Sequence, residues 1–422
     1  MLQIGFIREN SETVISRLKI KNFDAAALVA RILETDEKRR QAQTQLDQYL
    51  AEANKIAKSI GQLFSQGKKD EANKMRSRSA EIKTQTKALS SDLEKYSSAL
   101  HELVVQLPNL PHISVPPGKS SDDNEIIYQE GDINEKGDTD LPHWDLAKKH
   151  NIIDFELGNK VTGAGFPFYR GKGARLQRAL INFFLEEGIK AGYTEYQPPL
   201  LVNEDSAYGT GQLPDKEGQM YTVPVDGLYL IPTAEVPITN IYRNVILKEN
   251  DFPIKNVAYS NCFRREAGSW GSHVRGLNRL HQFDKVEIVQ IRKPEESYQA
   301  LEEMREYVAS LLRKLGLPFR IARLCGGDVS FTSALTYDFE VFSEAQKRWL
   351  EVSSVSNFED FQANRMKLRY KTKEGKSILA HTLNGSALAL PRIVAALLEN
   401  NQTDGGIRIP EVLVPYTGFE FI

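Results

Sequence analysis

Residues 262–291 read CFRREAGSWGSHVRGLNRLHQFDKVEIVQI. They hold the densest cluster in the chain of charged side chains that could take part in binding or catalysis. Alternating residues on either side of a glycine-bearing loop predict a β-hairpin, with one strand ending near Glu266 and the other beginning near Leu280. This segment is therefore expected to contribute two neighbouring antiparallel strands to a sheet.

The two expected strands place their charged residues on shared faces. Strand residues of like parity point the same way, so Arg264 lies with Glu266, and Phe283 lies with Lys285 and Glu287. An arginine directed at a phosphate, beside an aromatic ring on which a base can stack, is typical of a nucleotide site. Ordinary ion pairing on a sheet would explain the charges alone, so both interpretations stand at this point.

The whole chain has the composition of a globular protein. Its 422 residues are 41% hydrophobic and 26% charged, with a formal net charge of -2, which excludes wholesale disorder and fits two to four domains. No apolar run approaches the roughly 20 residues of a membrane helix, and the charged start leaves no signal-peptide core, so we expect a cytoplasmic protein. Cys262 and Cys325, with seven scattered histidines, predict neither a disulfide framework nor a zinc motif.

The first 105 residues differ from the rest. All 18 prolines lie at or after Pro108, and the first part carries a net charge of +4 against -6 for the remainder. Its apolar and small residues recur at alternating spacings of four and three, which predicts a heptad seam on two helices of about 35 residues. A short turn at residues 65–67 requires these helices to fold back antiparallel, as an arm about 50 Å long. The seam positions are Leu28, Ile32, Thr35, Arg39, Ala42, Leu46, Tyr49, Ala53, Ile56, Ile60 and Leu63, then Ala72, Met75, Ser79, Ile82, Thr86, Leu89, Leu93, Tyr96, Leu100 and Leu103.

The distal end of this arm is basic. A solvated helix face would produce the same charge pattern. A basic tip on a long lever also suits the phosphates of a nucleic acid, whose shape could then be recognised without base contacts. The basic residues of the tip are Lys55, Lys58, Lys68, Lys69, Lys74, Arg76 and Arg78.

After the arm, residues 107–142 are rich in Pro, Gly, Ser and acidic residues, as linkers are. Helical and strand-like segments are mixed in the remainder, which predicts an α+β domain. No glycine-rich dinucleotide motif and no P-loop are present. Helices are expected at residues 173–188, 295–315 and 387–400, and strands at 227–231, 257–263, 285–290 and 337–341.

Several segments resemble the class II aminoacyl-tRNA synthetases, and the seryl-tRNA synthetases in particular. FRREAG, followed by a loop and RLHQFDKVE, resembles motif 2 of that class, and NGSALALPRIVAALL resembles motif 3. The resemblance covers the whole chain, including the N-terminal arm, in the family's order and spacing. Its further segments are YGTGQLP at 208–214, IPTAEVPITN at 231–240, EVSSVSN at 351–357, HTLNGSALALPRIVAALLEN at 381–400 and IPEVLVPY at 409–416.

This resemblance implies an α+β fold in which a long N-terminal antiparallel coiled-coil hairpin precedes a class II antiparallel sheet flanked by helices. It implies a tRNA-binding domain at residues 1–106 with its arm at about 27–104, a linker at 107–142 and a catalytic domain at 143–422. The implied reaction activates L-serine with ATP to seryl-adenylate and pyrophosphate and then transfers serine to the 3′ end of serine tRNA. Selenocysteine tRNA stays open as a second substrate, Mg²⁺ is expected with ATP, and zinc is not expected.

The resemblance also implies roles for individual residues. Arg264 would hold the ATP α-phosphate, where charge builds as the serine carboxylate attacks, and Arg392 would contact the γ-phosphate of a bent ATP. These two are the expected catalytic residues, and in-line positioning with charge neutralisation makes a side-chain nucleophile unnecessary. The expected ATP contacts are Arg264, Arg265, Glu266, Leu280, Phe283, Glu351, Val352, Ser353, Ser354 and Arg392, with Glu351 and Ser354 also binding Mg²⁺. The expected serine contacts are Thr233, Ala234, Glu235, Arg264, Glu287, Asn384 and Ser386.

Partners follow from the same resemblance. The basic tip would bind the long variable arm of serine tRNA, and YTEYQPPLLV, with Pro198 and Pro199, would lie at a homodimer interface as motif 1. One departure concerns Pro391, which stands before Arg392 where many relatives have glycine and could shift the helix that carries the arginine.

Three alternatives compete with this interpretation. A threonine-specific synthetase would need a zinc site, for which the chain lacks a fitting set of Cys and His. A nonenzymatic RNA-binding or scaffold protein has no use for a complete ATP site. A carrier-protein ligase on the same fold would act on a carrier protein, which has no extended phosphate backbone for the arm to measure, so the arm opposes this alternative.

Overall fold

The computed structural model describes residues 1–133, 140–215, 217–266 and 274–422. These residues form two compact units, each with its own internal packing. The first unit comprises Met1–Lys19 and Phe23–Pro108, and the second comprises Ile20–Asn22 and Asn109–Ile422.

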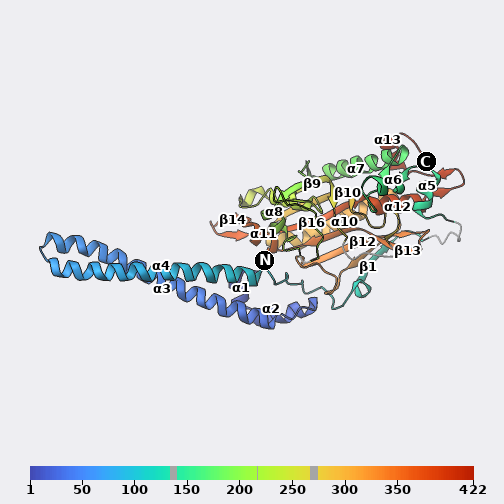
Figure 1. Ribbon diagram of the computed structural model, residues 1–422. Coiled ribbons are helices and arrows are strands. Elements are labelled where there is room, and N and C mark those ends of the chain that lie inside the picture. The colour runs from blue at the N-terminus through green and yellow to red at the C-terminus, as the bar shows by residue number, and fades with distance from the viewer. Residues whose placement is uncertain (134–139, 216, 267–273) are drawn as a thin grey trace. The chain divides into compact units, whose positions relative to one another are not determined.

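The first unit is helical, and two of its helices form the predicted antiparallel hairpin. Helices α3 (Ala26–Ser65) and α4 (Lys69–Val104) pack along each other, drawn in blue in Figure 1. The connection between them includes Gly67, whose φ of 76° lies in the left-handed region that glycine adopts without a Cβ penalty. Two short helices, α1 (Ile4–Glu9) and α2 (Ser11–Leu18), precede the hairpin.

The base of the hairpin differs from a simple heptad seam because α1 packs there as well. Asp36, which the seam left out, is almost fully buried on α3 and pairs with three arginines. Its carboxylate lies 2.9 Å from Arg8, 2.7 Å from Arg39 and 3.1 Å from Arg40. Burial opposes ionisation, but hydrogen bonds and charges from Arg39 and Arg8 outweigh it and hold the pKa of Asp36 below its usual value.

The second unit is built on an eight-stranded sheet in the order β1-β11-β12-β13-β16-β10-β9-β4. All neighbouring pairs are antiparallel except β4 with β9, which is parallel. This confirms the expected antiparallel sheet, including the hairpin of β9 and β10. The strands are β1 (Glu125–Glu130), β11 (Phe319–Arg323), β12 (Leu335–Ser343), β13 (Arg348–Asn357), β16 (His381–Ala389), β10 (Gln282–Arg292), β9 (Ile254–Phe263) and β4 (Thr194–Tyr196).

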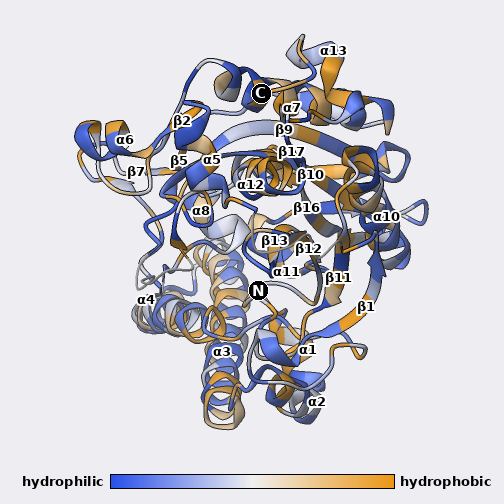
Figure 2. Ribbon diagram, turned by 90° about the vertical axis from the view of Figure 1, so that its right-hand side faces the viewer, coloured by the Kyte–Doolittle hydropathy of each residue, from blue (hydrophilic) through white to orange (hydrophobic). Residues whose placement is uncertain are grey.

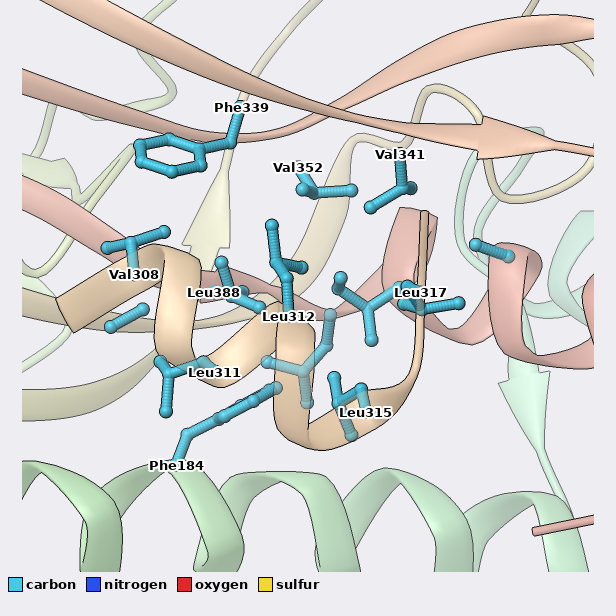
Figure 3. Close-up of a cluster of buried hydrophobic side chains, with 14 of the residues drawn as sticks. Phe184, Val308, Leu311, Leu312, Leu315, Leu317, Phe339, Val341, Val352 and Leu388 are labelled. Atoms are coloured by element: carbon cyan, nitrogen blue, oxygen red, sulfur yellow. The ribbon is translucent and has the colours of Figure 1, made fainter. Parts of the chain in front are cut away.

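Helices α7 (Lys172–Lys190), α10 (Ser297–Leu315) and α12 (Leu390–Asn400) pack against the apolar side of this sheet. Figure 3 shows Leu312 of α10 between Phe184 of α7 and the strand residues Phe339 and Val352. Each such side chain, when fully buried, stabilises the fold by roughly 1.5–3 kcal/mol. Helix α12 is largely orange in Figure 2, because most of its residues are apolar, and nearly all of them are buried.

The three predicted helices are present, and α12 begins three residues later than predicted because β16 continues to Ala389. Within the described part of the chain, no helix combines the length and apolar character needed to cross a membrane. The remaining helices are α5 (His143–Lys149), α6 (Phe155–Val161), α8 (Glu204–Thr210), α9 (Glu235–Asn240), α11 (Phe361–Met366) and α13 (Val414–Thr417). The remaining strands are β2 (Ile153–Asp154), β3 (Phe168–Tyr169), β5 (Leu201–Asn203), β6 (Thr222–Val223), β7 (Leu228–Leu230), β8 (Ile246–Lys248), β14 (Arg369–Lys371), β15 (Ser377–Leu379), β17 (Gln402–Thr403) and β18 (Gly406–Ile407).

The linker-like stretch 107–142 holds one strand of the main sheet. Strand β1 pairs with β11 at the sheet edge, and most of its side chains are exposed. An edge strand with so little burial lacks the apolar alternation that marks a strand in sequence, and composition alone therefore describes this stretch as a connection.

Candidate active site

The second face of the main sheet is polar and lines a cleft of about 1040 Å³. Strand alternation produces this division. Along β12, Phe339 and Val341 enter the apolar core, whereas Asp338 and Glu340 line the cleft. Strands β10 and β16 follow the same rule, so polar residues distant in sequence meet on one surface.

The β9–β10 hairpin places an arginine and an aromatic ring together. β9 ends at Phe263, directly before Arg264, and Phe263 pairs with Gln282 at the start of β10. The guanidinium carbon of Arg264 lies 5.2 Å from the ring centroid of Phe283. The loop between the strands includes residues 267–273, among them His273, and these lie outside the described residues.

Two further residues on the returning side of the loop line the cleft. Arg279 Nε lies 2.8 Å from a carboxylate oxygen of Glu266, and Leu280 is buried beside them. Glu266 adopts a φ of 50°, which is uncommon for a residue with a Cβ and follows the point where the β9 ladder stops. This pair joins the two sides of the hairpin, and both of its residues line the cleft.

A buried carboxylate forms the centre of a second group of contacts. Glu287 accepts hydrogen bonds from Thr233 Oγ1 at 2.8 Å and from Asn384 Nδ2 at 3.3 Å. Lys285 Nζ lies 2.6 Å from the same carboxylate. The network joins β10 to β16 and to the segment before α9, and its residues together line one part of the cleft, which we call the pocket beside Glu287.

Glu235, at the start of α9, lies in the same pocket and is also buried. Gln362 of α11 donates to it at 2.7 Å, and Thr382 in turn donates to Gln362 at 2.6 Å. Burial, and next the charge of Glu287, raise the pKa of Glu235 to about 7. Two carboxylates in one buried pocket favour a cationic ligand, which would relieve their repulsion.

Arg392, which also lines the cleft, is held from two sides. Its Nε donates to the carbonyl oxygen of Asn278 at 3.0 Å, and its Nη1 donates to that of Glu351 at 2.7 Å. Pro391 lies in the first turn of α12, where a backbone N–H would have no intrahelical partner. The proline therefore starts the helix without loss of a hydrogen bond.

Strands β12 and β13 bring oxygen-bearing side chains beside Arg392. Asp338 pairs with Ser354 in the strand register, and Glu351 lies on the same face. Burial, and next the charge of Glu351, raise the pKa of Asp338 well above its usual value. Oδ1 of Asp338 is a buried acceptor with no hydrogen-bond partner among the described residues.

The structure brings most of the sequence-predicted site residues into this one cleft. Ala234 and Arg265 do not line it. Ala234 is buried in a small apolar cluster, and the guanidinium of Arg265 lies 5.9 Å from the Tyr221 ring. Val352 borders the cleft, but its side chain points into the apolar core in Figure 3. The predicted residues that line the cleft are Thr233, Glu235, Arg264, Glu266, Leu280, Phe283, Glu287, Glu351, Val352, Ser353, Ser354, Asn384, Ser386 and Arg392.

Other residues of the site carry little signal in the sequence. Asp338 could have been noticed from its position between apolar neighbours in the strand of residues 337–341. Gln362 and Asn278 gave no comparable signal, because their neighbours carry no periodic pattern that points to a cleft.

In the first unit, all seven predicted basic residues of the tip are exposed, but their surroundings differ. Arg78 forms a two-point pair with Glu52, at 2.8 and 3.1 Å, and a further bond to Glu81 at 3.2 Å. Arg76 instead lies over the ring of Phe64, at 5.0 Å from the centroid. Arg78 is therefore already occupied with carboxylates of the arm itself.

Comparison with known proteins agrees with this geometry. The family model "tRNA synthetase class II core domain (G, H, P, S and T)" matches residues 221–401, which include the hairpin, the central strands and all of α12. The fold and the site thus define a class II aminoacyl-tRNA synthetase. The model "Seryl-tRNA synthetase N-terminal domain" matches residues 1–111.

The full-length relatives name the family. A serine–tRNA ligase of Salinibacter ruber is 52% identical over 99% of this chain and 98% of its own length. One of Akkermansia muciniphila is 48% identical over 100% and 99%. The chain belongs to the seryl-tRNA synthetase family.

A solved structure extends the likeness to three dimensions. The crystal structure of seryl-tRNA synthetase from Pyrococcus horikoshii complexed with ATP superposes with a TM-score of 0.93 at 34% identity, covering 100% of this chain and 99% of that one. The chain is accordingly a ligase that uses ATP to activate serine and joins it to tRNA.

Proposed function

We propose that the cleft binds ATP between Arg264 at one end and Arg392 at the other. Arg264 directly follows β9 and lies beside Phe283. A nucleotide whose base stacks on the Phe283 ring would therefore place its α-phosphate near the guanidinium of Arg264. The hydrogen bonds that Arg392 donates through Nε and Nη1 fix the plane of its guanidinium group. Nη2 then remains to donate to an oxygen of the γ-phosphate. Preorganised positive charge at both ends stabilises the negative charge that develops during adenylate formation.

The small pocket beside Glu287 is the proposed serine site. The carboxylates of Glu287 and Glu235 suit the ammonium group, and Thr233, Asn384 and Ser386 supply polar contacts for the remainder of the molecule. A buried site built to bond the serine hydroxyl rejects alanine, because an absent hydroxyl leaves these polar groups unpaired. In this arrangement the serine carboxylate reaches Arg264 and attacks the α-phosphate directly.

The residues beside Arg392 fit a magnesium ion bound together with ATP. Mg²⁺ prefers oxygen ligands and is usually held by one or two carboxylates plus substrate phosphates. The unpartnered Oδ1 of Asp338 and its raised pKa support this assignment, because a cation would relieve the crowding of Asp338 and Glu351. In the described residues, no group of three or more His, Cys, Asp or Glu is arranged to hold a metal alone. Glu351 and Ser354 would therefore share the ion with the triphosphate, where it would neutralise phosphate charge.

For the second step, we assign residues 1–106 to tRNA binding, 107–142 to the connection and 143–422 to catalysis. The exposed basic tip of the arm suits the phosphates of the long variable arm of serine tRNA. A homodimer is supported by Tyr196, on the edge strand β4 of the main sheet, and by Leu201, which begins β5 five residues later; both are large apolar side chains exposed to more than a third of their area. We place the reaction in the cytoplasm, where ATP and tRNA are used for translation.

The observation that carries this proposal is the meeting of Arg264, Glu287 and Arg392 in a single cleft. The decisive experiment is ATP–pyrophosphate exchange by the purified protein with each of the twenty amino acids, with Mg²⁺ present and tRNA absent. We expect exchange with serine alone. Exchange with another amino acid would refute the assigned serine pocket, and no exchange would refute an activation step that is independent of tRNA.

A further inference from the structure

A fully buried histidine, His143, lies behind the cleft without lining it. Its Nε2 accepts the backbone N–H of Leu277 at 2.8 Å, and its Nδ1 lies 2.6 Å from Oε1 of Glu399. Because Nε2 accepts a hydrogen bond, Nδ1 must carry the proton that is donated to Glu399. The ring therefore links the end of α12 to the returning side of the motif 2 loop.

Glu399 gathers several donors in the protein interior. Besides the His143 ring, it accepts the backbone N–H of His143 at 2.9 Å, Gln346 Nε2 at 2.9 Å and the hydroxyl of Ser343. A carboxylate in the last turn of a helix faces the negative end of the helix dipole, so its burial there depends on such donors. The cluster therefore has the character of a fixed support.

Gln346 extends this support to the cleft. Its Oε1 accepts Asn278 Nδ2 at 2.9 Å, and the backbone oxygen of Asn278 accepts Arg392 Nε. Arg392 and Glu399 are seven residues apart on α12, which is about two turns and places them on one face. Residues 277–278, which line the cleft, are thus held by both residues of this face. Arg392 bonds Asn278 directly, and Glu399 acts through His143 and Gln346.

The packing around the ring leaves little room for other arrangements. Gly276 has a φ of 69°, and a Cβ there would lie 2.2 Å from Nε2 of His143. The close approach of backbone and imidazole requires glycine at this position. A segment packed and bonded in this way offers Arg392 a rigid acceptor.

We propose that His143 is a positioning residue for the nucleotide, acting through Glu399 and Leu277 to fix the segment that orients Arg392. The inference rests on the proposed contact of Arg392 with ATP phosphate. His143 touches no substrate. Its effect is to hold the carbonyl of Asn278 where it fixes the guanidinium plane, so that ATP meets a preorganised arginine.

Two substitutions of His143 separate its two bonds. His143→Asn keeps a donor near Glu399 but is too short to accept from Leu277, whereas His143→Gln reaches the position of Nε2 with an acceptor oxygen. In ATP–pyrophosphate exchange, we expect His143→Asn to raise the KM for ATP about tenfold, with the KM for serine within about twofold. We expect His143→Gln to stay within about threefold for both.

The matched control is His381→Asn, because His381 bonds Ser297 Oγ at 2.8 Å and neither residue lines the cleft. It should leave the KM for ATP unchanged. Equal rises of both KM values in His143→Asn, or an equal effect of His143→Asn and His143→Gln, would overturn the proposal. Circular dichroism melting checks that each variant is folded.

If His143→Asn fails to fold, the half-buried Gln346 provides the test. Gln346→Ala removes the bond to Asn278, and a selective rise in the KM for ATP is expected, so an unchanged value refutes the proposal. Arg392→Ala separates this inference from the proposed function. If Arg392→Ala leaves the KM for ATP unchanged, the phosphate assignment of Arg392 fails. If it raises that KM while the His143 and Gln346 variants do not, only the positioning role fails.

Discussion

Thr233 donates its hydroxyl hydrogen to Glu287, with 2.8 Å between Oγ1 and Oε2. The two residues are 54 positions apart, one before α9 and the other in the middle of β10. The bond fixes the orientation of a carboxylate that is almost completely buried. It thereby helps to set the shape of the pocket assigned to serine.

Thr233→Val keeps the shape of this side chain and removes the hydroxyl. Because Glu287 then loses a donor, we expect the KM for serine to rise about tenfold, as the loss of one buried hydrogen bond predicts. The preference for serine over alanine should shrink as well. Pyrophosphate exchange with both amino acids measures this. Thr239→Val is the matched control, since its buried Oγ1 has no hydrogen-bond partner among the described residues and should be nearly neutral.

Arg264 and Arg265 are neighbours in sequence with different surroundings. Arg264→Ala should lower the rate of serine activation by about 10²–10³-fold, the usual cost of one group that stabilises transition-state charge. Arg265→Ala should stay within about threefold, because Arg265 does not line the cleft. Exchange kinetics at saturating serine compare the two. An unaltered rate in Arg264→Ala would disprove its assigned role.

The pKa of Glu235, raised to about 7 by burial and then by Glu287, predicts a pH dependence of serine binding. Because the pKa is raised, the carboxyl is ionised above about pH 7 and neutral below it. The ammonium group of serine needs the ionised form of Glu235. Lys285 and Arg264 also favour that form, but their effect on the pKa is smaller than that of burial and Glu287. We expect the KM for serine at saturating ATP to rise about tenfold from pH 8 to pH 6.

Glu235→Gln supplies the control for this pH dependence. It has no titrating group at that position, so its KM for serine should be high and nearly constant over the same range. A wild-type KM that does not change between pH 8 and pH 6 would contradict the assignment of Glu235 to the ammonium group.

Neutralising the tip of the arm should separate the two steps of the reaction. The combined replacement of Lys68, Lys69, Lys74 and Arg76 by Gln should raise the KM for tRNA by at least tenfold and weaken its salt dependence, because fewer phosphates are neutralised. Serine activation should be unchanged. Aminoacylation and exchange assays on one preparation measure both, and an equal loss of the two activities would contradict this division.

Two neighbouring arginines refine this prediction. Arg76→Gln should weaken tRNA binding more than Arg78→Gln, because Arg78 is already paired with Glu52 and Glu81. The comparison uses the KM for tRNA in aminoacylation. A larger effect of Arg78→Gln would show that its carboxylate partners release it to the nucleic acid.

Much of the fold could be predicted from local periodicity in the sequence. The alternating spacing of four and three residues predicts the hairpin of α3 and α4, and the alternation around residues 262–291 predicts β9 and β10. Arg264 and Phe283 could be placed together for the same reason, because a hairpin brings its two ends into register. Repeated side-chain patterns report helices and strands directly, since each element buries one face.

Long-range packing decided the remainder. Asp36 is buried because α1 packs on the base of α3, which no heptad pattern reports. Gln362 reaches Glu235 across 127 residues, and Asp338 meets Glu351 because β12 and β13 pair at a shifted register. His143 touches Leu277 over 134 residues. Such contacts depend on how the strands and helices stack, and that arrangement is set by the summed burial of the core and not by any short stretch of chain.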